Sequence, residues 1–160
     1  MGWPAVRKIG STSTTRRLLA TPLAVWERDG VKTALLKAGL PADDVGSPGL
    51  LIWRYESSAD IPAGFGGLEI HGSDALLRSV VTLPPLRQMG IGGAIVTLLE
   101  GEARALKCQT IYLVTTSETR FFSRLGYAAC DRSAVPDAIR RSSHFGRLCC
   151  ASGTVMLKQV

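Results

Sequence analysis

A glycine-rich segment, Gly90-Ile91-Gly92-Gly93, carries the clearest chemical signal in this sequence. It follows a predicted strand and opens a predicted helix. At such a place glycines let backbone N–H groups converge on phosphate oxygens at the positive end of the helix. A Walker loop would need a G-x-x-x-x-G-K-[ST] pattern, and a dinucleotide fingerprint would need a third glycine where Ile95 stands. The segment therefore predicts a phosphate-binding loop of another kind.

Two predicted strands before this loop carry acid–base groups. Glu69, His71 and Asp74 lie at the end of the first strand and in the turn after it, where each could take a proton from an ammonium group. Side-chain alternation places Glu69 and His71 on one face, and His71, which borders the turn, is expected to be exposed. A glutamate on an interior face needs a reason, so Glu69 is either a site residue or a solvated strand residue.

Two arginines are candidates for binding an anionic group. Arg78 lies in the middle of the second strand. Its guanidinium either clamps a carboxylate or phosphinate-like group bidentately or is buried beside an internal acid such as Glu69. Arg140 follows the last predicted helical turn and begins a polar cluster that ends at His144. This cluster either closes over a bound substrate or forms a solvated loop.

The helices and strands that would position these residues follow from hydrophobic periodicity and turn signals. Helical spacing runs from Leu23 to Leu36, where Asp29-Gly30 is a potential break, and again from Ile91 to about Lys107. A capping box, Thr115-x-x-Glu118, opens a further short helix. Strands are predicted at residues 50–55, 63–71, 75–82, 110–116 and 153–157. The result is an α+β sheet domain with one crossover helix after the glycine-rich loop.

Length and composition limit the class of protein. The 160 residues, 46% hydrophobic and with a formal net charge of +6, are the size of one compact domain. No apolar run approaches the roughly 18 to 20 residues of a membrane span. The net charge suits an acidic ligand but barely favours nucleic acid, and we expect neither a nucleic-acid nor a membrane partner. Four cysteines without a C-x-x-C pair or a histidine at ligand spacing favour reduced thiols in the cytoplasm and no metal site.

The domain boundaries follow from the same composition. Residues 1–21 are expected to form an irregular segment, although their Arg, Ser and Thr content imitates a transit peptide. Residues 22–160 are expected to form a single domain, since no internal repeat or linker interrupts them. The chemistry therefore has to be found within one sheet domain.

Two motifs in this order resemble the GNAT N-acetyltransferases: Arg87-x-x-Gly90-x-Gly92 and the box Phe121-Phe122-Ser123-Arg124-Leu125-Gly126-Tyr127. The resemblance implies the GNAT fold, in which a mixed, mostly antiparallel central sheet is splayed at the acetyl-CoA site and flanked by helices. It implies acetyl-CoA as co-substrate. A backbone N–H near Val81 would meet the acetyl carbonyl oxygen. The residues that the resemblance assigns to acetyl-CoA are Val80, Val81, Thr82, Arg87, Gln88, Met89, Gly90, Ile91, Gly92, Gly93, Phe122 and Arg124.

Further segments, among them residues 35–41, 75–79 and 138–140, resemble the GNAT subgroup associated with arsenic resistance. That resemblance implies direct acetyl transfer to the amino group of a small amino-acid-like acceptor, of the arsinothricin or phosphinothricin type. Glu69 would be the general base, and Glu69, Arg78 and Arg140 would bind the acceptor. The family's pairing through exposed strands allows a homodimer.

One position departs from the wider family pattern. Phe122 stands where many GNAT enzymes have a tyrosine thought to protonate the leaving thiolate. Because phenylalanine has no proton to give, the general acid is left open among Ser117, Ser123, a water molecule and unaided departure. Two alternatives therefore stay open: a non-catalytic acyl-CoA-binding regulatory module, and an acetyltransferase that acts on protein or peptide amino groups.

Overall fold

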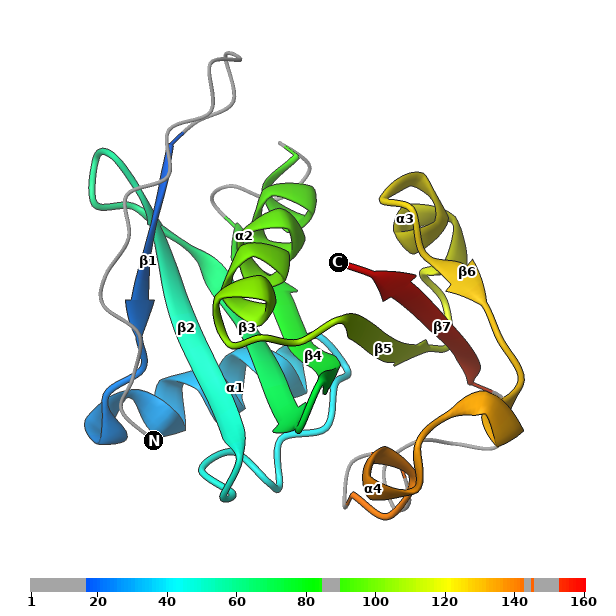
Figure 1. Ribbon diagram of the computed structural model, residues 1–160. Coiled ribbons are helices and arrows are strands. Elements are labelled where there is room, and N and C mark those ends of the chain that lie inside the picture. The colour runs from blue at the N-terminus through cyan, green and yellow to red at the C-terminus, as the bar shows by residue number, and fades with distance from the viewer. Residues whose placement is uncertain (1–16, 85–89, 143–144, 146–152) are drawn as a thin grey trace.

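The computed structural model describes residues 17–84, 90–142, 145 and 153–160 of the chain (Figure 1). Its centre is a seven-stranded sheet with the order β1-β2-β3-β4-β5-β7-β6. Only β4 and β5 pair in parallel, and all the other neighbours are antiparallel. The mixed, mostly antiparallel sheet that the sequence predicts is therefore confirmed. The strands are β1 (Leu18–Pro22), β2 (Leu50–Ser57), β3 (Pro62–His71), β4 (Asp74–Thr82), β5 (Thr110–Thr115), β6 (Ala128–Ala129) and β7 (Thr154–Gln159).

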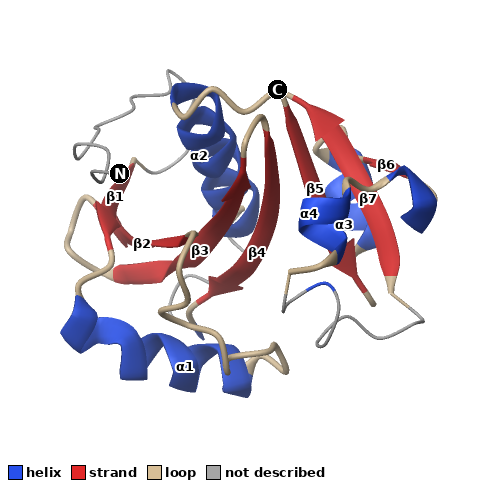
Figure 2. Ribbon diagram, turned by 60° about the horizontal axis from the view of Figure 1, so that its bottom comes forward, coloured by secondary structure: helices blue, strands red, loops and turns tan. Residues whose placement is uncertain are grey.

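Helices cover both faces of this sheet. Figure 2 shows α1 against one face and α2 against the other. Helix α2 is the crossover that a parallel β4–β5 pair requires. The helices are η1 (Val25–Glu27), α1 (Arg28–Lys37), α2 (Ile91–Ala105), α3 (Thr119–Arg124), η3 (Arg132–Ala134) and α4 (Asp137–Arg140).

The N-terminal part of the domain differs from the prediction in two places. The prediction that the chain is irregular through residue 21 is wrong from Leu18 onward. Strand β1 pairs there with the edge of β2 and buries Leu18 and Ala20. Helix α1 runs without a break through Gly30, so the predicted interruption at that residue does not occur. In both places tertiary packing overrides a weak local signal.

The start of α3 also differs in detail from its prediction. Thr115 Oγ1 accepts a hydrogen bond from the Glu118 backbone N–H at 2.9 Å, as the predicted capping box requires. The helix itself begins only at Thr119, with Glu118 as its N-cap and no side-chain cap. Thr115 is the last residue of β5, so its hydroxyl closes the turn between the strand and the helix.

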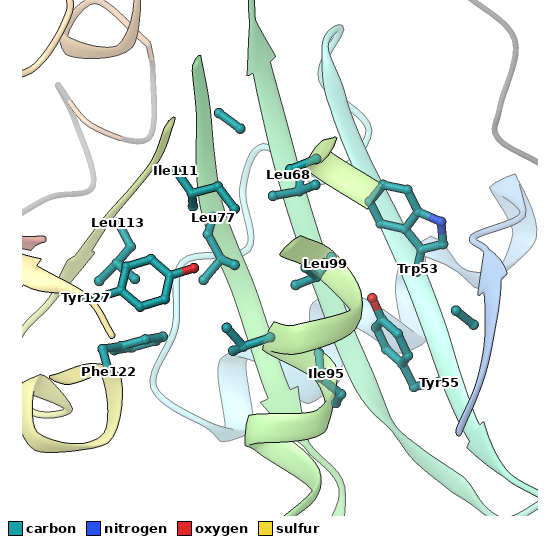
Figure 3. Packing of buried hydrophobic residues seen from close by; sticks show 14 of the residues in the cluster. Trp53, Tyr55, Leu68, Leu77, Ile95, Leu99, Ile111, Leu113, Phe122 and Tyr127 are labelled. Atoms are coloured by element: carbon teal, nitrogen blue, oxygen red, sulfur yellow. The ribbon is translucent and has the colours of Figure 1, made fainter. Parts of the chain in front are cut away.

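The α2 face of the sheet holds the larger hydrophobic core (Figure 3). Strand β3 is rich in glycine here because α2 lies directly on it. A Cβ at Gly64 would clash first with the backbone carbonyl oxygen of Val81 on β4 and would also come within 2.9 Å of Ile95 Cδ1 on α2. A Cβ at Gly66 would come within 2.7 Å of Leu99 Cδ1. These glycines weaken the strand intrinsically but allow the close approach of the helix.

The α1 face carries two smaller cores, and a polar gap lies between them. One core packs α1 against Leu50 and Ile52 of β2, and the other packs α4 against Leu76 of β4. The register places Glu69 opposite both Leu50 and Leu76, and Gly67 pairs with both Ile52 and Arg78. Because paired residues point to the same face, the Glu69 and Arg78 side chains lie on the α1 face between the two cores.

Candidate active site

Strands β4 and β5 are paired only at their beginnings. The parallel register joins residues 74–76 to residues 110–112, after which β4 continues to Thr82 and β5 to Thr115 without further pairing between them. Figure 1 shows the two strands diverging from this point. Within the described chain, no strand pairs with this edge of the second half of β4, whose backbone groups can therefore bind an extended ligand.

A bulge lies in the second half of β4, which pairs with β3 on one edge and not with β5 on the other. The register between β3 and β4 shifts there, and Ser79 adopts a φ of +60°, in the left-handed region. Arg78 lies on the α1 face before the bulge, and Val81 returns to that face after it, while Val80 packs toward α2. The extra residue therefore reorients the backbone of residues 80–82, the segment expected to contact the acetyl end of the coenzyme.

The start of α2 lies against the end of this strand. Gly90, the N-cap of α2, has a φ of +74°, which glycine adopts without strain. A Cβ at Gly92 would lie 3.3 Å from Phe121 Cζ and 3.6 Å from Thr82 Oγ1. The first turn of α2, the end of β4 and α3 therefore meet closely at Gly92, where even a Cβ would press on the Phe121 ring.

The N-terminal end of α2 at this junction has the features of an anion-binding helix start. A helix start of small residues presents its first backbone N–H groups to an anion. Among the described residues no side chain caps this helix end. Gly90, Ile91, Gly92 and Gly93 form this helix start, and their contact with the coenzyme stays a prediction. Arg87, Gln88 and Met89 lie outside the described residues.

Helix α3 contributes aromatic surface to this junction. The Phe122 ring is buried and makes edge-to-face contacts with Phe121 and Tyr127, at centroid distances of 4.9 Å and 5.7 Å. Arg124, on the last turn of α3, is exposed. Phe122 therefore supplies packing, and its ring carries no group that could protonate a thiolate.

The nearby Tyr127 hydroxyl is engaged elsewhere. It donates to Glu100 Oε1 on α2 at 3.2 Å, and the same carboxylate accepts from Lys158 Nζ at 3.0 Å. Burial, followed by the negative charge of Glu100, raises the pKa of Tyr127. A tyrosine whose proton is held this firmly is a poor proton donor, so its place in the box does not make it a substitute for the missing acid.

On the other face, four polar side chains from three segments meet. Arg78 donates through its two terminal nitrogens to the two carboxylate oxygens of Asp44, in the loop between α1 and β2. Its Nη1 also lies 3.4 Å from Glu69 Oε2. Glu69 Oε1 lies 2.7 Å from His71 Nε2. We call Asp44, Glu69, His71 and Arg78 the acceptor-face cluster.

Burial distinguishes the members of the acceptor-face cluster. Arg78 is 4% exposed and Glu69 is 9% exposed, so Glu69 is not the solvated strand residue that was one of its two interpretations. His71 is half-buried against Glu69, and the exposed position predicted for it is wrong. The reason is the Glu69 carboxylate two residues earlier on the same face, which holds the imidazole.

Asp44 is the member that the sequence analysis missed. It is 34 residues from Arg78 in the chain, and the only local feature of its segment is a turn after Pro41. Nothing in composition or periodicity assigns a partner to a loop aspartate. A buried arginine in a strand does, however, require a carboxylate from somewhere, and that requirement was the available signal.

Arg140 lies on the same side of the sheet, on α4, but apart from this cluster in its contacts. It is exposed and pairs with Asp137 one turn earlier. Its neighbour Ile139 is fully buried in the core around Leu76, which anchors α4 next to strand β4. His144, the last member of the predicted polar cluster, lies outside the described residues.

The described residues contain no group of three or more His, Cys, Asp and Glu side chains that could hold a metal ion. In the same residues, no helix has the length and apolar character needed to cross a membrane. Cys108 and Cys130 are free thiols whose pKa is raised, first by burial and then by neighbouring aspartates. Cys149 and Cys150 lie outside the described residues.

A sheet opened between its parallel strands, a bulged strand and a glycine-started helix together define a coenzyme-binding α+β fold. The model of the acetyltransferase (GNAT) family matches residues 13–127, well over half of the sequence. The chain therefore belongs to the GNAT acetyltransferase family, whose members transfer acetyl groups from acetyl-CoA. None of the curated proteins matches it significantly in sequence.

Solved structures show the same fold at low identity. N-acetylglutamate synthase from Neisseria gonorrhoeae, in complex with coenzyme A and N-acetyl-glutamate, matches with a TM-score of 0.73 and 9% identity over 89% of this chain and 35% of its own. This chain thus spans about a third of that protein. Rv2747 from Mycobacterium tuberculosis, in complex with CoA and NLQ, matches with a TM-score of 0.68 and 21% identity over 88% and 98% of the two chains.

A third structural match acts on a protein. Ribosomal-protein-S18-alanine N-acetyltransferase from Escherichia coli matches with a TM-score of 0.66 and 12% identity over 89% of this chain and 94% of its own. At these identities the matches establish the GNAT fold. They do not select an acceptor, because one neighbour is bound to N-acetyl-glutamate and another is named for a ribosomal protein.

Proposed function

We propose that this acetyltransferase moves the acetyl group of acetyl-CoA directly to the amino group of a small amino-acid-like acceptor, of the arsinothricin or phosphinothricin type. The observation that carries the proposal is the buried Glu69 carboxylate, which lies on the same sheet face as Arg78 and beside the strand that opens from β5. Acetyl-CoA supplies an activated thioester carbonyl when it is bound. The chain has to hold it and to deliver a neutral amine.

The proposed coenzyme residues follow the junction of β4, α2 and α3. The amides at the start of α2, together with Arg87, Gln88 and Met89, would hold the pyrophosphate. The open edge of β4 at Val80, Val81 and Thr82 would pair with the pantetheine, and the Val81 N–H would donate to the carbonyl oxygen. The ring of Phe122 and the exposed Arg124 would lie beside the coenzyme.

Glu69 is the proposed general base. It would take a proton from the acceptor ammonium, directly or through a water molecule, and leave a neutral amine as the nucleophile. Its hydrogen bond to His71 is a route by which that proton could leave the site. Because Phe122 has no proton to offer, protonation of the departing thiolate would fall to Ser117, Ser123 or solvent.

Two arginines are proposed for the acceptor side. Arg140 on α4 is exposed, and an anionic group of the acceptor would compete with Asp137 for it. Arg78 is buried and already bonded to Asp44, so it would support the acceptor through its contact with Glu69. A cytoplasmic location and a homodimer remain expectations that rest on cysteine usage and on the family resemblance.

Two other functions have specific support. The absence of a hydroxyl at Phe122 favours a regulatory module that binds acyl-CoA without turnover. The fold similarity to an enzyme that acetylates a ribosomal protein favours a peptide acceptor. The first predicts coenzyme binding without release of CoA, and the second predicts turnover with peptides and none with free amino acids.

The test is CoA release from acetyl-CoA by the purified protein across free amino acids, phosphinothricin, arsinothricin and short peptides. We expect turnover confined to the amino-acid-like acceptors. Glu69→Gln should lower kcat/KM for the best acceptor by about 100-fold or more and alter its pH profile, the range expected for loss of a general base. Glu56→Gln on β2, whose carboxylate pairs with Arg54, is the matched control. Turnover with peptides alone, or a wild-type pH profile in Glu69→Gln, would contradict the proposal.

A further inference from the structure

The strongest interaction in the acceptor-face cluster is the pair that Arg78 of β4 makes with Asp44, which lies in the loop between α1 and β2 and not on strand β3 or β4. The Asp44 carboxylate accepts hydrogen bonds from both terminal nitrogens of Arg78, which is a bidentate arrangement. Glu69 accepts one longer hydrogen bond, at 3.4 Å from Arg78 Nη1 to Glu69 Oε2. Arg78 is therefore committed to the loop carboxylate. Bidentate pairs of this kind are the strongest that a guanidinium forms with a carboxylate.

We infer that Asp44 is a positioning residue of the acceptor site: it holds the Arg78 guanidinium so that the Glu69 carboxylate stays available to the acceptor ammonium. The inference rests on the proposed function. Without Asp44, the Arg78 guanidinium would form a bidentate pair with Glu69, its other carboxylate contact among those described. Glu69 would then be neutralised by a buried cation, and both its attraction for an ammonium group and its availability as a base would fall.

The charges of the acceptor-face cluster support this role. Asp44 and Glu69 contribute two negative charges against the single positive charge of Arg78, and His71 is uncharged unless protonated. The Glu69 carboxylate lies in a largely buried place, where it would attract an approaching ammonium group more strongly than it would in water. The side chains of Asp44, Glu69 and His71 each keep some exposure, whereas that of Arg78 is 1% exposed, so the anionic part of the cluster is the part a ligand can reach.

The packing of the loop argues against a different use of the same pair. If an acceptor carboxylate displaced Asp44 from Arg78, the Asp44 side chain would have to turn away from the cluster, and the backbone that carries it has little freedom to follow. Ala42 and Val45, on either side of Asp44, are 4% and 8% exposed and belong to the core under α1. Moving Asp44 away would disturb that core, so the Asp44–Arg78 pair acts as a fixed support.

The first experiment needs no substrate. The chain has two histidines, and the ring signals of His71 are identified in the NMR spectrum by their loss in His71→Gln. In Asp44→Asn, Arg78 turns to Glu69 and weakens its bond to His71, so the His71 ring signals should shift. Asp43→Asn, the same change at the exposed neighbouring residue, should leave them in place. Unchanged His71 signals in folded Asp44→Asn would overturn the inference.

The second experiment measures kinetics with a free amino acid and with its amide. Asp44→Asn should lower kcat/KM for both acceptors at least tenfold and leave the KM for acetyl-CoA unchanged, whereas Asp43→Asn should match the wild type. Asp44→Glu keeps the charge and should recover kcat/KM to within about threefold. Asp44→Ser, which also removes the charge, takes the place of Asp44→Asn in both experiments if that variant does not fold. A lower KM for the free amino acid alone would show that Asp44 competes with the acceptor, and would overturn the inference. A wild-type protein without turnover would refute the proposed function, while the NMR shift would still decide the role of Asp44.

Discussion

Gly92 is the residue of the proposed coenzyme site at which a larger side chain would press on its neighbours most directly. Valine there would place its Cβ 3.3 Å from the Phe121 ring, and its methyl groups would have to displace α3 or the end of β4. We expect Gly92→Val to weaken acetyl-CoA binding at least tenfold, about 1.4 kcal/mol, because the helix start and the strand edge would no longer fit one ligand. Isothermal titration calorimetry with acetyl-CoA measures the change.

Gly101 provides a matched control on the same helix. A Cβ at Gly101 meets nothing within 4 Å, and the residue lies well along α2 from its N-terminal turn. Gly101→Val makes the same change in composition and should leave the dissociation constant of acetyl-CoA within about twofold of the wild type, since the added Cβ meets no neighbour and the residue lies away from the start of α2. If Gly92→Val and the wild type bind acetyl-CoA with equal affinity, the proposal that the start of α2 belongs to the coenzyme site is contradicted.

At the scale of elements, α2 buries two glutamates near two tyrosines of the sheet domain, and the two tyrosines differ in hydrogen bonding. The Tyr127 hydroxyl donates to Glu100, whose carboxylate also binds Lys158 of β7. The Tyr55 hydroxyl, on β2, is buried without a hydrogen-bond partner in the described part of the chain. Figure 3 shows the two rings on opposite sides of α2. The hydrogen bond of Tyr127 ties the helix to the opened half of the sheet, whereas the Tyr55 ring packs without a hydrogen bond.

The same substitution should therefore have different effects at these two positions. Tyr127→Phe removes a buried hydrogen bond to a charged group and should lower the free energy of unfolding by about 1 to 3 kcal/mol. Tyr55→Phe removes an unpaired buried hydroxyl and should leave the free energy of unfolding unchanged or raise it by up to about 1 kcal/mol. Urea unfolding at neutral pH measures both, and each variant serves as the control for the other. A greater loss in Tyr55→Phe than in Tyr127→Phe would contradict this assignment.

For the whole molecule, these tyrosines predict how stability depends on pH. Burial, with the charges of Glu102 and Glu100 respectively, raises the pKa of Tyr55 and of Tyr127 above the ordinary value of 10.0. In the unfolded chain both phenols ionise near pH 10, while in the folded chain both keep their protons. The free energy of unfolding therefore keeps its full value below about pH 10, as far as these two tyrosines are concerned, and falls as the pH rises further.

The expected slope is about 1.4 kcal/mol per pH unit for each tyrosine. Urea unfolding at a series of pH values from about 9 to about 11.5 measures it. In either single Tyr→Phe variant, the free energy of unfolding should fall less steeply with pH in this range. The slope should decrease by the contribution of one tyrosine, because one of the two ionising groups is gone. Slopes identical to the wild type in both variants would show that other groups cause the alkaline loss.

Much of the element order was predictable because its signals are local. The strand at residues 75–82, the helix that starts at Ile91 and the strand that follows it each carry a periodic apolar pattern and a turn signal, and each lies within a residue or two of its prediction. Strand β1 was not predictable, because its few residues become a strand only when the edge of β2 is beside them. Side-chain period and turn chemistry act over a few residues, whereas strand pairing depends on segments far apart in the chain.

The candidate site divides in the same way. The sequence by itself determined the glycine-started helix, the Phe121–Phe122 box and the candidacy of Glu69 and Arg78, because backbone freedom and side-chain chemistry are properties of single residues and short motifs. Only the tertiary structure decided that Arg78 bonds to Asp44, that His71 is held by Glu69 and that β4 leaves β5 after three residue pairs. Charges pair with whatever the fold brings within a few ångströms, and no local rule specifies a partner 34 residues away.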